Sequence, residues 1–327
     1  MNYIGSKRRL SSFLFETISD TVGSLKDKTF CDLFAGTGIV GRTFKSKVAK
    51  VISNDLEYYS YVLNRNYIQN HQPITYQDIL ERLNHLPGKK GFIYQNYCLE
   101  SGSGRNYFSG ENAARIDAIR QEIEQYKEEE NLYYFLLASL LESLDKVSNT
   151  ASVYGSFLKH LKPTAQVPLQ LEPALFEYND NTHEVYNEDS NKLIKKIKGD
   201  ILYLDPPYNG RQYGANYHLL NTIATYNTNF IPKGKTGTKA DYNRSMYCKT
   251  KRVYNSFEDL IKNADFQYIF LSYNNEGMVP QHELQTLLKR YGRYSLVTTS
   301  YKRFKADSNR SHKAKKTEEH LHILKKF

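Results

Sequence analysis

The sequence predicts an α/β protein, in which a sheet flanked by helices is split by a mostly helical insertion. Strand-like apolar segments alternate with amphipathic helices from residue 11 to about residue 70, and strand-like segments return after about residue 180. Between these regions the apolar residues have mostly helical spacing. We therefore expect residues 1–75 and 180–327 to form one α/β domain around an insertion of residues 76–179.

The first part of the sheet is predicted from five successive segments. They are a helix over 11–22, a strand over 28–34, a helix over 39–47, a strand over 50–54 and a helix over 57–70. Parallel strands need a crossover connection, and a helix usually provides it. This order is therefore typical of the start of a parallel α/β sheet.

The clearest element of the insertion is a helix over 131–148, whose apolar residues cover a wide face. Strands are expected over 184–187, 200–204, 266–272 and 294–300, with helices around 190–197, 216–226 and 280–290. A basic, turn-rich stretch over 233–252 interrupts this second half.

The composition favours a nucleic acid over a membrane as the binding partner. The chain has 45 Lys and Arg against 35 Asp and Glu, which gives a net charge of +10, and such a surplus favours association with polyanions. The three cysteines lie far apart, which excludes a disulfide scaffold and gives no metal-ligand spacing. No apolar run approaches the roughly 18 residues of a membrane span, and the first residues do not resemble a signal peptide. We expect a cytoplasmic protein without a metal site.

The first candidate site is the turn DLFAGTG, residues 32–38, which runs from a strand into a helix. Gly36 and Gly38 allow the backbone close to a ligand, and the following helix presents unpaired N–H groups. The turn is not GxGxxG, which argues against a dinucleotide. Asp55 ends the next strand, about 20 residues after Gly36. An acidic residue at such a position can hydrogen-bond the ribose hydroxyls of an adenosine-containing ligand. A simple tight connection, with Asp55 as a helix cap, is the alternative.

The second candidate site is Asp205-Pro206-Pro207-Tyr208, directly after the apolar strand ILYL. The prolines hold the chain in an extended turn at the carboxyl end of the strand, where open α/β sheets bind ligands. Asp205 and the Pro206 carbonyl offer two hydrogen-bond acceptors for an amino group. Tyr208 offers a flat face on which the planar ring that carries this amino group could stack. The alternative is a proline-stopped strand with Tyr208 in the core.

Together the residues of NYIGSK (2–7), DLFAGTG (32–38), Asp55 and DPPY (205–208) resemble the DNA adenine-N6 methyltransferases of the Dam-like order. The resemblance implies a Rossmann-like methyltransferase sheet and S-adenosyl-L-methionine as cofactor, with no metal. It also implies methylation of adenine N6 in double-stranded DNA after base flipping. A restriction-modification or phage DNA-modification context, with a possible cognate restriction endonuclease, would follow in a bacterial or phage setting.

The resemblance also implies roles for individual residues. Cofactor binding is expected from Tyr3, Lys7, Asp32, Phe34, Gly36, Gly38, Asp55 and Asp189, with Lys7 near the methionine carboxylate and Asp189 on the adenine. Glu188 is an alternative match for Asp189. Catalysis is expected from Asp205, Pro206, Pro207 and Tyr208, in which Asp205 and Pro206 accept hydrogen bonds from N6 and Tyr208 stacks on the flipped base. No His general base is required, because the methylated nitrogen is strongly acidic and loses its proton after transfer.

Candidate DNA contacts come from the basic residues Arg105, Lys235, Arg244, Lys249, Lys251 and Arg252. Arg105 lies in a turn of the insertion that is otherwise an ordinary surface loop. The basic tail over 302–316 is interpreted as a solvated face. The segment SYNNEG (272–277) either lines the target pocket, supports Asp205 or is a polar loop after a buried strand.

Three other functions compete with this interpretation. A cytosine-N4 methyltransferase tends to have Ser before PPY, and a glutamine methyltransferase of translation factors has Asn there, whereas this chain has Asp205. A non-catalytic DNA-binding module would share the basic surface, but it would have no use for Lys7, Asp55 and Asp205 beside the glycine turn. We therefore expect the central insertion to contribute to target recognition by an adenine-N6 enzyme.

Overall fold

The computed structural model describes residues 3–275, 277–302 and 316–327. The chain divides into two compact units. The α/β unit consists of Gly5–Leu56, Asn179–Gln212 and Arg244–Phe327, and the helical unit consists of Met1–Ile4, Glu57–Tyr178 and Tyr213–Asn243. Each unit is built from three segments of the chain.

The helical unit is larger than the expected insertion of residues 76–179. Its longest segment begins at Glu57, and the unit also takes in residues 213–243, because α3 (Tyr58–Asn64) and α10 (His218–Thr225) share one apolar core with the central helices. Tyr59, Val62 and Leu63 of α3 are buried in that core.

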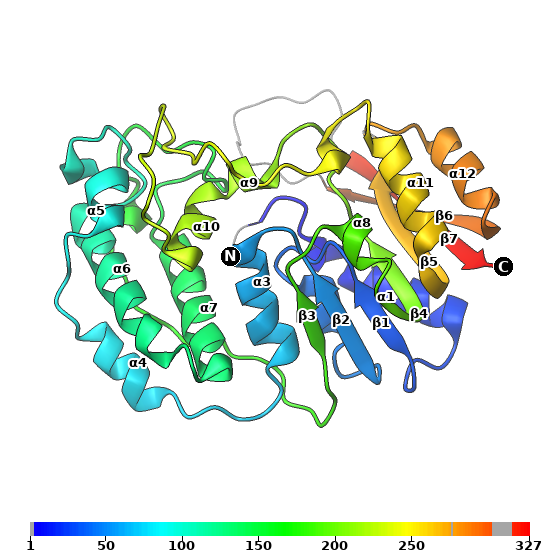
Figure 1. Ribbon diagram of the computed structural model, residues 1–327, viewed down its shortest axis with the longest axis horizontal. Helices are drawn as coiled ribbons and strands as arrows, with labels where there is room; N and C mark the ends of the chain where they lie inside the picture. The colour runs from blue at the N-terminus through cyan, green and yellow to red at the C-terminus, as the bar shows by residue number, and fades with distance from the viewer. Residues whose placement is uncertain (1–2, 276, 303–315) are drawn as a thin grey trace. The chain divides into compact units, whose positions relative to one another are not determined.

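The α/β unit contains a seven-stranded sheet in the order β3-β2-β1-β4-β5-β7-β6 (Figure 1). Its strands are β1 (Thr29–Asp32), β2 (Lys50–Asn54), β3 (Glu184–Tyr186), β4 (Lys198–Leu204), β5 (Asp265–Asn274), β6 (Gly292–Lys302) and β7 (Lys316–Lys326). Strands β3, β2, β1, β4 and β5 are parallel, and β7 runs antiparallel between β5 and β6. The Rossmann-like α/β fold is thereby confirmed.

β7 and α11 (Val253–Asn263) are not predicted from the sequence. β7 follows the basic tail, and polar residues such as Glu319, His320 and His322 interrupt its apolar pattern although they are buried. α11 begins at the end of the basic stretch.

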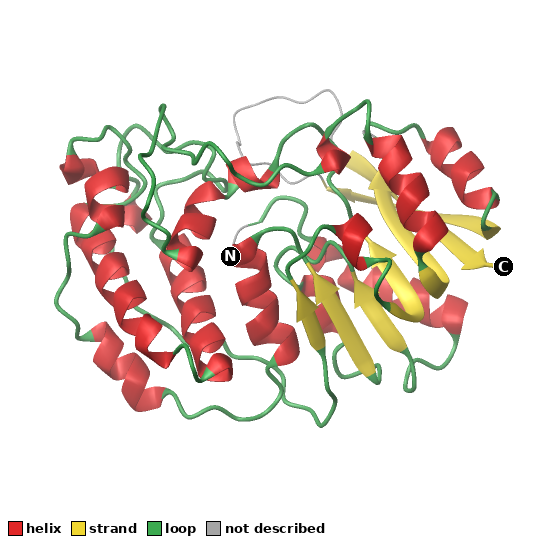
Figure 2. Ribbon diagram, in the orientation of Figure 1, coloured by secondary structure: helices red, strands yellow, loops and turns green. Residues whose placement is uncertain are grey.

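Helices cover both faces of the sheet (Figure 2). On one face Phe44 of α2 (Ile39–Phe44) stacks on Phe30 of β1 at 4.1 Å between ring centroids, next to α1 (Ser11–Val22). On the other face α8 (Ser190–Leu193), α11 and α12 (Gln281–Lys289) bury an apolar core against β1, β4 and β5. Burial of both faces explains the nearly continuous apolar strands.

Register places the ends of β1 and β4 together. Asp32, the last residue of β1, pairs with Tyr203 of β4, so Asp205 follows two residues beyond that pair. The chain crosses over in opposite directions from these two adjacent strands. Ligands of open α/β sheets bind at such a point, outside the carboxyl ends of the strands.

The helical unit has its own core around α7 (Glu130–Lys146), which matches the helix expected over 131–148. Its other helices are α3, α4 (Gln77–Asn84), α5 (Phe92–Tyr97), α6 (Gly110–Ile123), α9 (Tyr213–Asn216) and α10, and α3 continues into a π-helical turn over Arg65–Gln69.

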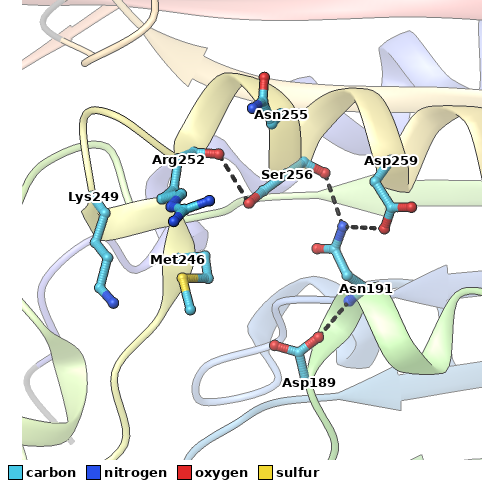
Figure 3. Close-up of a pocket in the computed structure, with 8 residues that line it drawn as sticks. All are labelled: Asp189, Asn191, Met246, Lys249, Arg252, Asn255, Ser256 and Asp259. Atoms are coloured by element: carbon cyan, nitrogen blue, oxygen red, sulfur yellow. Dashed lines mark hydrogen bonds between the residues drawn. The ribbon is translucent and has the colours of Figure 1, made fainter.

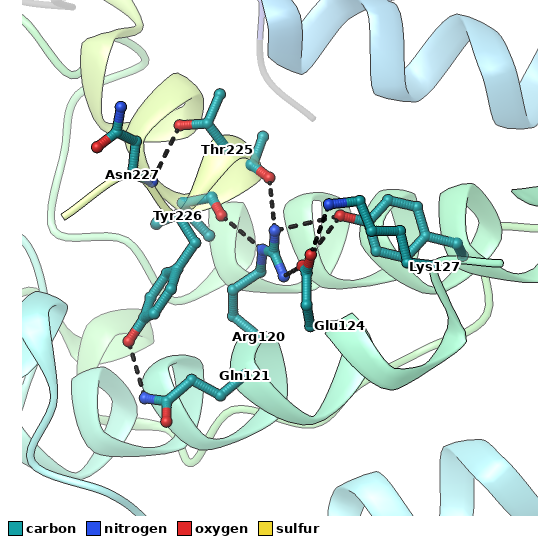
Figure 4. Close-up of polar contacts among 10 residues, drawn as sticks. Arg120, Gln121, Glu124, Lys127, Thr225, Tyr226 and Asn227 are labelled. Carbon is teal, nitrogen blue, oxygen red and sulfur yellow. Dashed lines mark hydrogen bonds and ion pairs between the residues drawn. The ribbon is translucent and has the colours of Figure 1, made fainter. Parts of the chain in front are cut away.

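Buried Arg120 of α6 joins α10 to this core (Figure 4). Its guanidinium donates to the carbonyls of Ile223 and Ala224 at 3.0 and 3.1 Å and pairs with Glu124 at 2.8 Å. It thereby satisfies carbonyl groups that the end of α10 leaves unpaired.

Candidate functional site

The glycine turn between β1 and α2 is fixed by local backbone geometry and by Asp55. Gly36 and Gly38 have φ angles of +52° and +76°, in the left-handed region that favours glycine. The Gly36 N–H donates to Asp55 Oδ2 at 2.8 Å. Asp55 therefore joins the turn to the end of β2. It does not cap the next helix, because α3 begins after Glu57.

Asp32 lies beneath this turn and is 1% exposed. Its Oδ2 accepts a hydrogen bond from the Gly41 N–H at 3.1 Å, whereas Oδ1 is buried and has no hydrogen-bond partner among the described residues. Burial, followed by the nearby charge of Asp205, raises the pKa of Asp32 to about 8. A cation beside the open acceptor would favour the ionised form of Asp32, so the position is suited to a cationic ligand.

The DPPY segment begins where β4 ends. The Lys7 ammonium lies 2.8 Å from Asp205 Oδ1 and 3.2 Å from Glu319 Oε1, and it also contacts the Tyr208 hydroxyl. The Tyr208 hydroxyl in turn lies 2.6 Å from Asp205 Oδ1 and 3.0 Å from Glu319 Oε1. We call these four residues the Lys7 cluster.

Burial and the charges of the Lys7 cluster shift the pKa of Asp205 in opposite directions. Burial raises the pKa of Asp205, the Lys7 ammonium lowers it, and the charge of Glu319 raises it again. Lys7 and Glu319 are 4% and 0% exposed, so water screens these charges weakly. The Lys7 ammonium contacts Asp205 and Glu319, and its expected place near the cofactor carboxylate stays a prediction.

Glu319 was missed by the sequence analysis. It lies on β7, opposite Asn274 of β5 and Thr299 of β6. Its position is the one local clue, because on a strand Glu319 faces the same side as the apolar residues Leu321 and Ile323.

The Tyr208 ring is half-buried and packs edge-to-face on Tyr273, with 5.2 Å between centroids. The main-chain N–H of Met278 donates to the Tyr208 carbonyl at 3.1 Å. Tyr273, at the end of β5, and Met278, in the segment that follows, therefore both contact Tyr208 of the DPPY motif. The neighbouring Phe34 meets Tyr247 edge-on at 5.0 Å.

Tyr3 belongs to the helical unit. Its ring stacks on Tyr217 at 4.9 Å between centroids and lies tilted against Tyr59 and Tyr213. This aromatic group anchors the start of the chain within that unit, and the Tyr217 hydroxyl accepts a hydrogen bond from the Ile4 N–H.

Asp189 is the N-cap of α8, since its Oδ1 accepts from the N–H groups of Asn191 and Lys192 at 3.0 and 3.1 Å. It also lines a surface pocket of about 500 Å³ together with Lys249 and Arg252 (Figure 3). The structure thus brings together residues that were expected to bind cofactor and DNA separately. Glu188, the alternative match, pairs instead with Lys196 at 2.5 Å.

The remaining DNA candidates fall in both units. Lys235 is exposed in the helical unit, and Arg244, Lys249, Lys251 and Arg252 are exposed in the α/β unit. Arg105 has a structural function, because its guanidinium donates to the carbonyls of Asn96, Pro232 and Gly234. In the basic tail, residues 303–315 lie outside the described residues.

The described residues contain neither a metal-binding cluster nor a membrane-spanning helix. Over 3–275, 277–302 and 316–327, no three or more His, Cys, Asp or Glu side chains are grouped so that they could hold a metal ion. In the same part of the chain, no helix is both long enough and apolar enough to cross a membrane.

A Rossmann-like sheet with a glycine turn after β1 and a DPPY motif after β4 defines a methyltransferase. The chain belongs to the D12 class N6 adenine-specific DNA methyltransferases, whose family model matches residues 3–287. The chain is therefore an enzyme that methylates adenine N6 in DNA. This membership sets aside the cytosine, protein and non-catalytic alternatives.

Three curated relatives carry names of restriction-modification enzymes. Type II methyltransferase M.NlaIII of Neisseria lactamica is 61% identical, over 100% of this chain and 99% of its own. Type II methyltransferase M.CviAII of Paramecium bursaria Chlorella virus 1 is 41% identical, over 94% and 93%. Type II methyltransferase M.FokI of Planomicrobium okeanokoites is 39% identical over 99% of this chain, which matches 52% of that protein.

Proposed function

We propose that the enzyme transfers the methyl group of S-adenosyl-L-methionine to N6 of an adenine flipped out of double-stranded DNA. One observation carries the proposal. Asp32, with its open acceptor, ends β1, and Asp205 comes directly after the adjacent strand β4, with which β1 pairs. A cationic cofactor and an amino-group substrate can therefore meet at one edge of the sheet.

The residues of the turn fit S-adenosylmethionine. The unpartnered Asp32 Oδ1 and the raised pKa of Asp32 call for a positive group, and the methionine ammonium is such a group. Asp32, Phe34, Gly36 and Gly38 would hold the methionine part, Asp55 would bind the ribose hydroxyls, and Asp189 would contact the adenine. When bound, the cofactor supplies a methyl group that its sulfonium centre has already activated.

Lys7 and Tyr3 keep their expected places beside the methionine end of the cofactor. The Lys7 ammonium is also engaged by Asp205 and Glu319, which joins it to the DPPY motif.

Asp205, Pro206 and Tyr208 would hold the target base. The Asp205 carboxylate and the Pro206 carbonyl would accept the two N6–H bonds, which favours pyramidal nitrogen and stabilises the positive charge that develops there. Pro207 would fix this turn. The raised pKa of Asp205 also suits it to take the extra proton from nitrogen. The Tyr208 ring would stack on the base, whose extraction costs a few kcal/mol.

For DNA, the proposal uses the exposed basic residues Lys235, Arg244, Lys249, Lys251 and Arg252 as phosphate contacts. The central region, residues 76–179, would contribute to sequence recognition. A cognate restriction endonuclease is a proposed partner, and the proposed location is the cytoplasm of a bacterial or phage-infected cell.

Single-molecule sequencing of DNA from a methylation-free host that expresses the chain tests this proposal. N6-methyladenine in one recurrent motif, lost in the Asp205→Ala variant, is the expected result. N4-methylcytosine, or an Asp205→Ala variant that still methylates, would overturn it. In parallel, radiolabelled S-adenosylmethionine should bind both proteins, because Asp205 is assigned to the target amine.

A further inference from the structure

Glu319 occupies a position that the family match does not include, since the match ends at residue 287. The side chain is fully buried, and its two oxygens differ. Oε1 lies 3.2 Å from the Lys7 ammonium and 3.0 Å from the Tyr208 hydroxyl, whereas Oε2 has no hydrogen-bond partner among the described residues.

Such a residue is costly for stability. A buried carboxylate with one unpartnered oxygen loses hydration that its contacts replace only in part. Positions 321 and 323, in phase on the same strand, are Leu and Ile, so an apolar side chain would serve strand packing better. The geometry therefore indicates that Glu319 has a function besides packing.

Glu319 and Asp205 share the same two donors. The Lys7 ammonium contacts both carboxylates, and the Tyr208 hydroxyl, which has a single hydrogen, lies within reach of both. Without Glu319, Asp205 would be the only carboxylate of the cluster left to both donors. That would make Asp205 a weaker acceptor for a target amino group.

We propose that Glu319 is a positioning residue for methyl transfer, which shares Lys7 and the Tyr208 hydroxyl with Asp205 and so keeps Asp205 able to accept a hydrogen bond from the N6 amino group. Its unpartnered Oε2 can receive a second donor when the substrate displaces one from Asp205. This inference rests on the proposed function, because it assumes that Asp205 accepts the N6–H bond.

The pH profile separates this function from a packing role. Asp205 is surrounded by Lys7 near the N-terminus, Tyr203 on its own strand, Asp32 on β1, Tyr208, and Glu319 on β7. The charge of Glu319 raises the pKa of Asp205. The substitution Glu319→Gln keeps the shape and removes that charge, so the acid limb of kcat/KM should move to lower pH.

The experiment uses the full chain, tritiated S-adenosylmethionine and a duplex with the target motif found by sequencing. We expect Glu319→Gln to lower kcat by on the order of 10-fold or more, because misplaced catalytic groups cost rates of this size, and to shift the acid limb downward. Cofactor affinity should change much less than kcat. Glu318→Gln is the matched control, because Glu318 is the preceding residue on β7 and is exposed.

Unchanged kcat and an unmoved acid limb in Glu319→Gln would overturn the inference. If that variant does not fold, as judged by circular dichroism and cofactor binding, Glu319→Asp replaces it. This variant keeps the charge at a shorter reach, so it should retain the acid limb and lose part of kcat; full wild-type kcat would overturn the inference. Asp205→Ala is measured alongside: if it still turns over, the proposed function fails whatever Glu319 does.

Discussion

Removal of the buried charge at Asp32 should stabilise the cofactor-free protein at alkaline pH. The pKa of Asp32 is about 8 in the folded protein against an ordinary value of 3.8. Between these values the folded state keeps a proton that the unfolded state has lost. Stability therefore falls as pH rises through this window, and the loss is complete above pH 8.

The magnitude follows from the shift. At 1.36 kcal/mol per pKa unit, ionisation of Asp32 costs the folded state up to about 5–6 kcal/mol above pH 8. About 2–3 kcal/mol of this develops between pH 6 and pH 8. The substitution Asp32→Asn abolishes the titration, while its amide oxygen can still accept from the Gly41 N–H. The stability of the variant relative to wild type should therefore rise by that amount between pH 6 and pH 8.

Urea unfolding of the cofactor-free proteins measures this difference. Circular dichroism is the suitable probe, because the chain has no Trp. Asp27→Asn is the control, since Asp27 is exposed in the loop before β1 and its curve should run parallel to wild type. Parallel curves for wild type and Asp32→Asn would refute the reasoning. The variant should also bind S-adenosylmethionine about 10- to 100-fold more weakly, because a charged partner is lost.

Three other substitutions test single contacts. Asp55→Ala should raise the KM for S-adenosylmethionine about 10-fold with kcat nearly unchanged at saturation, because ribose hydrogen bonds are lost; a fall in kcat alone would contradict the ribose assignment. Tyr208→Ala should weaken capture of the flipped base by about 1–3 kcal/mol, measured as a reduced 2-aminopurine signal, and an unchanged signal would remove Tyr208 from the base pocket. Arg120→Met should lower the free energy of unfolding by about 2–3 kcal/mol, because two buried carbonyls lose a charged donor. Arg82→Met is the control, because Arg82 forms a surface ion pair with Glu122. This substitution should change the free energy of unfolding by less than about 1 kcal/mol.

The sequence predicted the elements whose signal is local. Apolar runs indicated six of the seven strands, and glycine or proline marked the turns after β1 and β4. β7 escaped because both of its faces are buried with polar residues among the apolar ones, so neither alternation nor a continuous apolar run stands out.

The contacts that define the candidate site are not local. Lys7 and Asp205 are 198 residues apart, and spacing says nothing about which carboxylate receives the ammonium. Arg105 illustrates the converse, because its polar loop predicts a ligand contact from the sequence, whereas its hydrogen bonds to the carbonyls of Pro232 and Gly234 can be known only from the structure. The limits of the helical unit likewise depend on how α3 packs, which its own sequence does not specify.

The position of β7 has a consequence for how the protein is made. This strand comes last in the chain, yet it pairs with β5 on one side and β6 on the other. Until residues 316–326 have been synthesised and have left the ribosome, both neighbours have an unpaired edge, and unpaired edges promote aggregation. The Lys7 cluster also lacks Glu319 until then. A nascent chain should therefore depend on chaperones until β7 has paired, and a stop codon before residue 316 should yield an aggregating product instead of a weakly active enzyme.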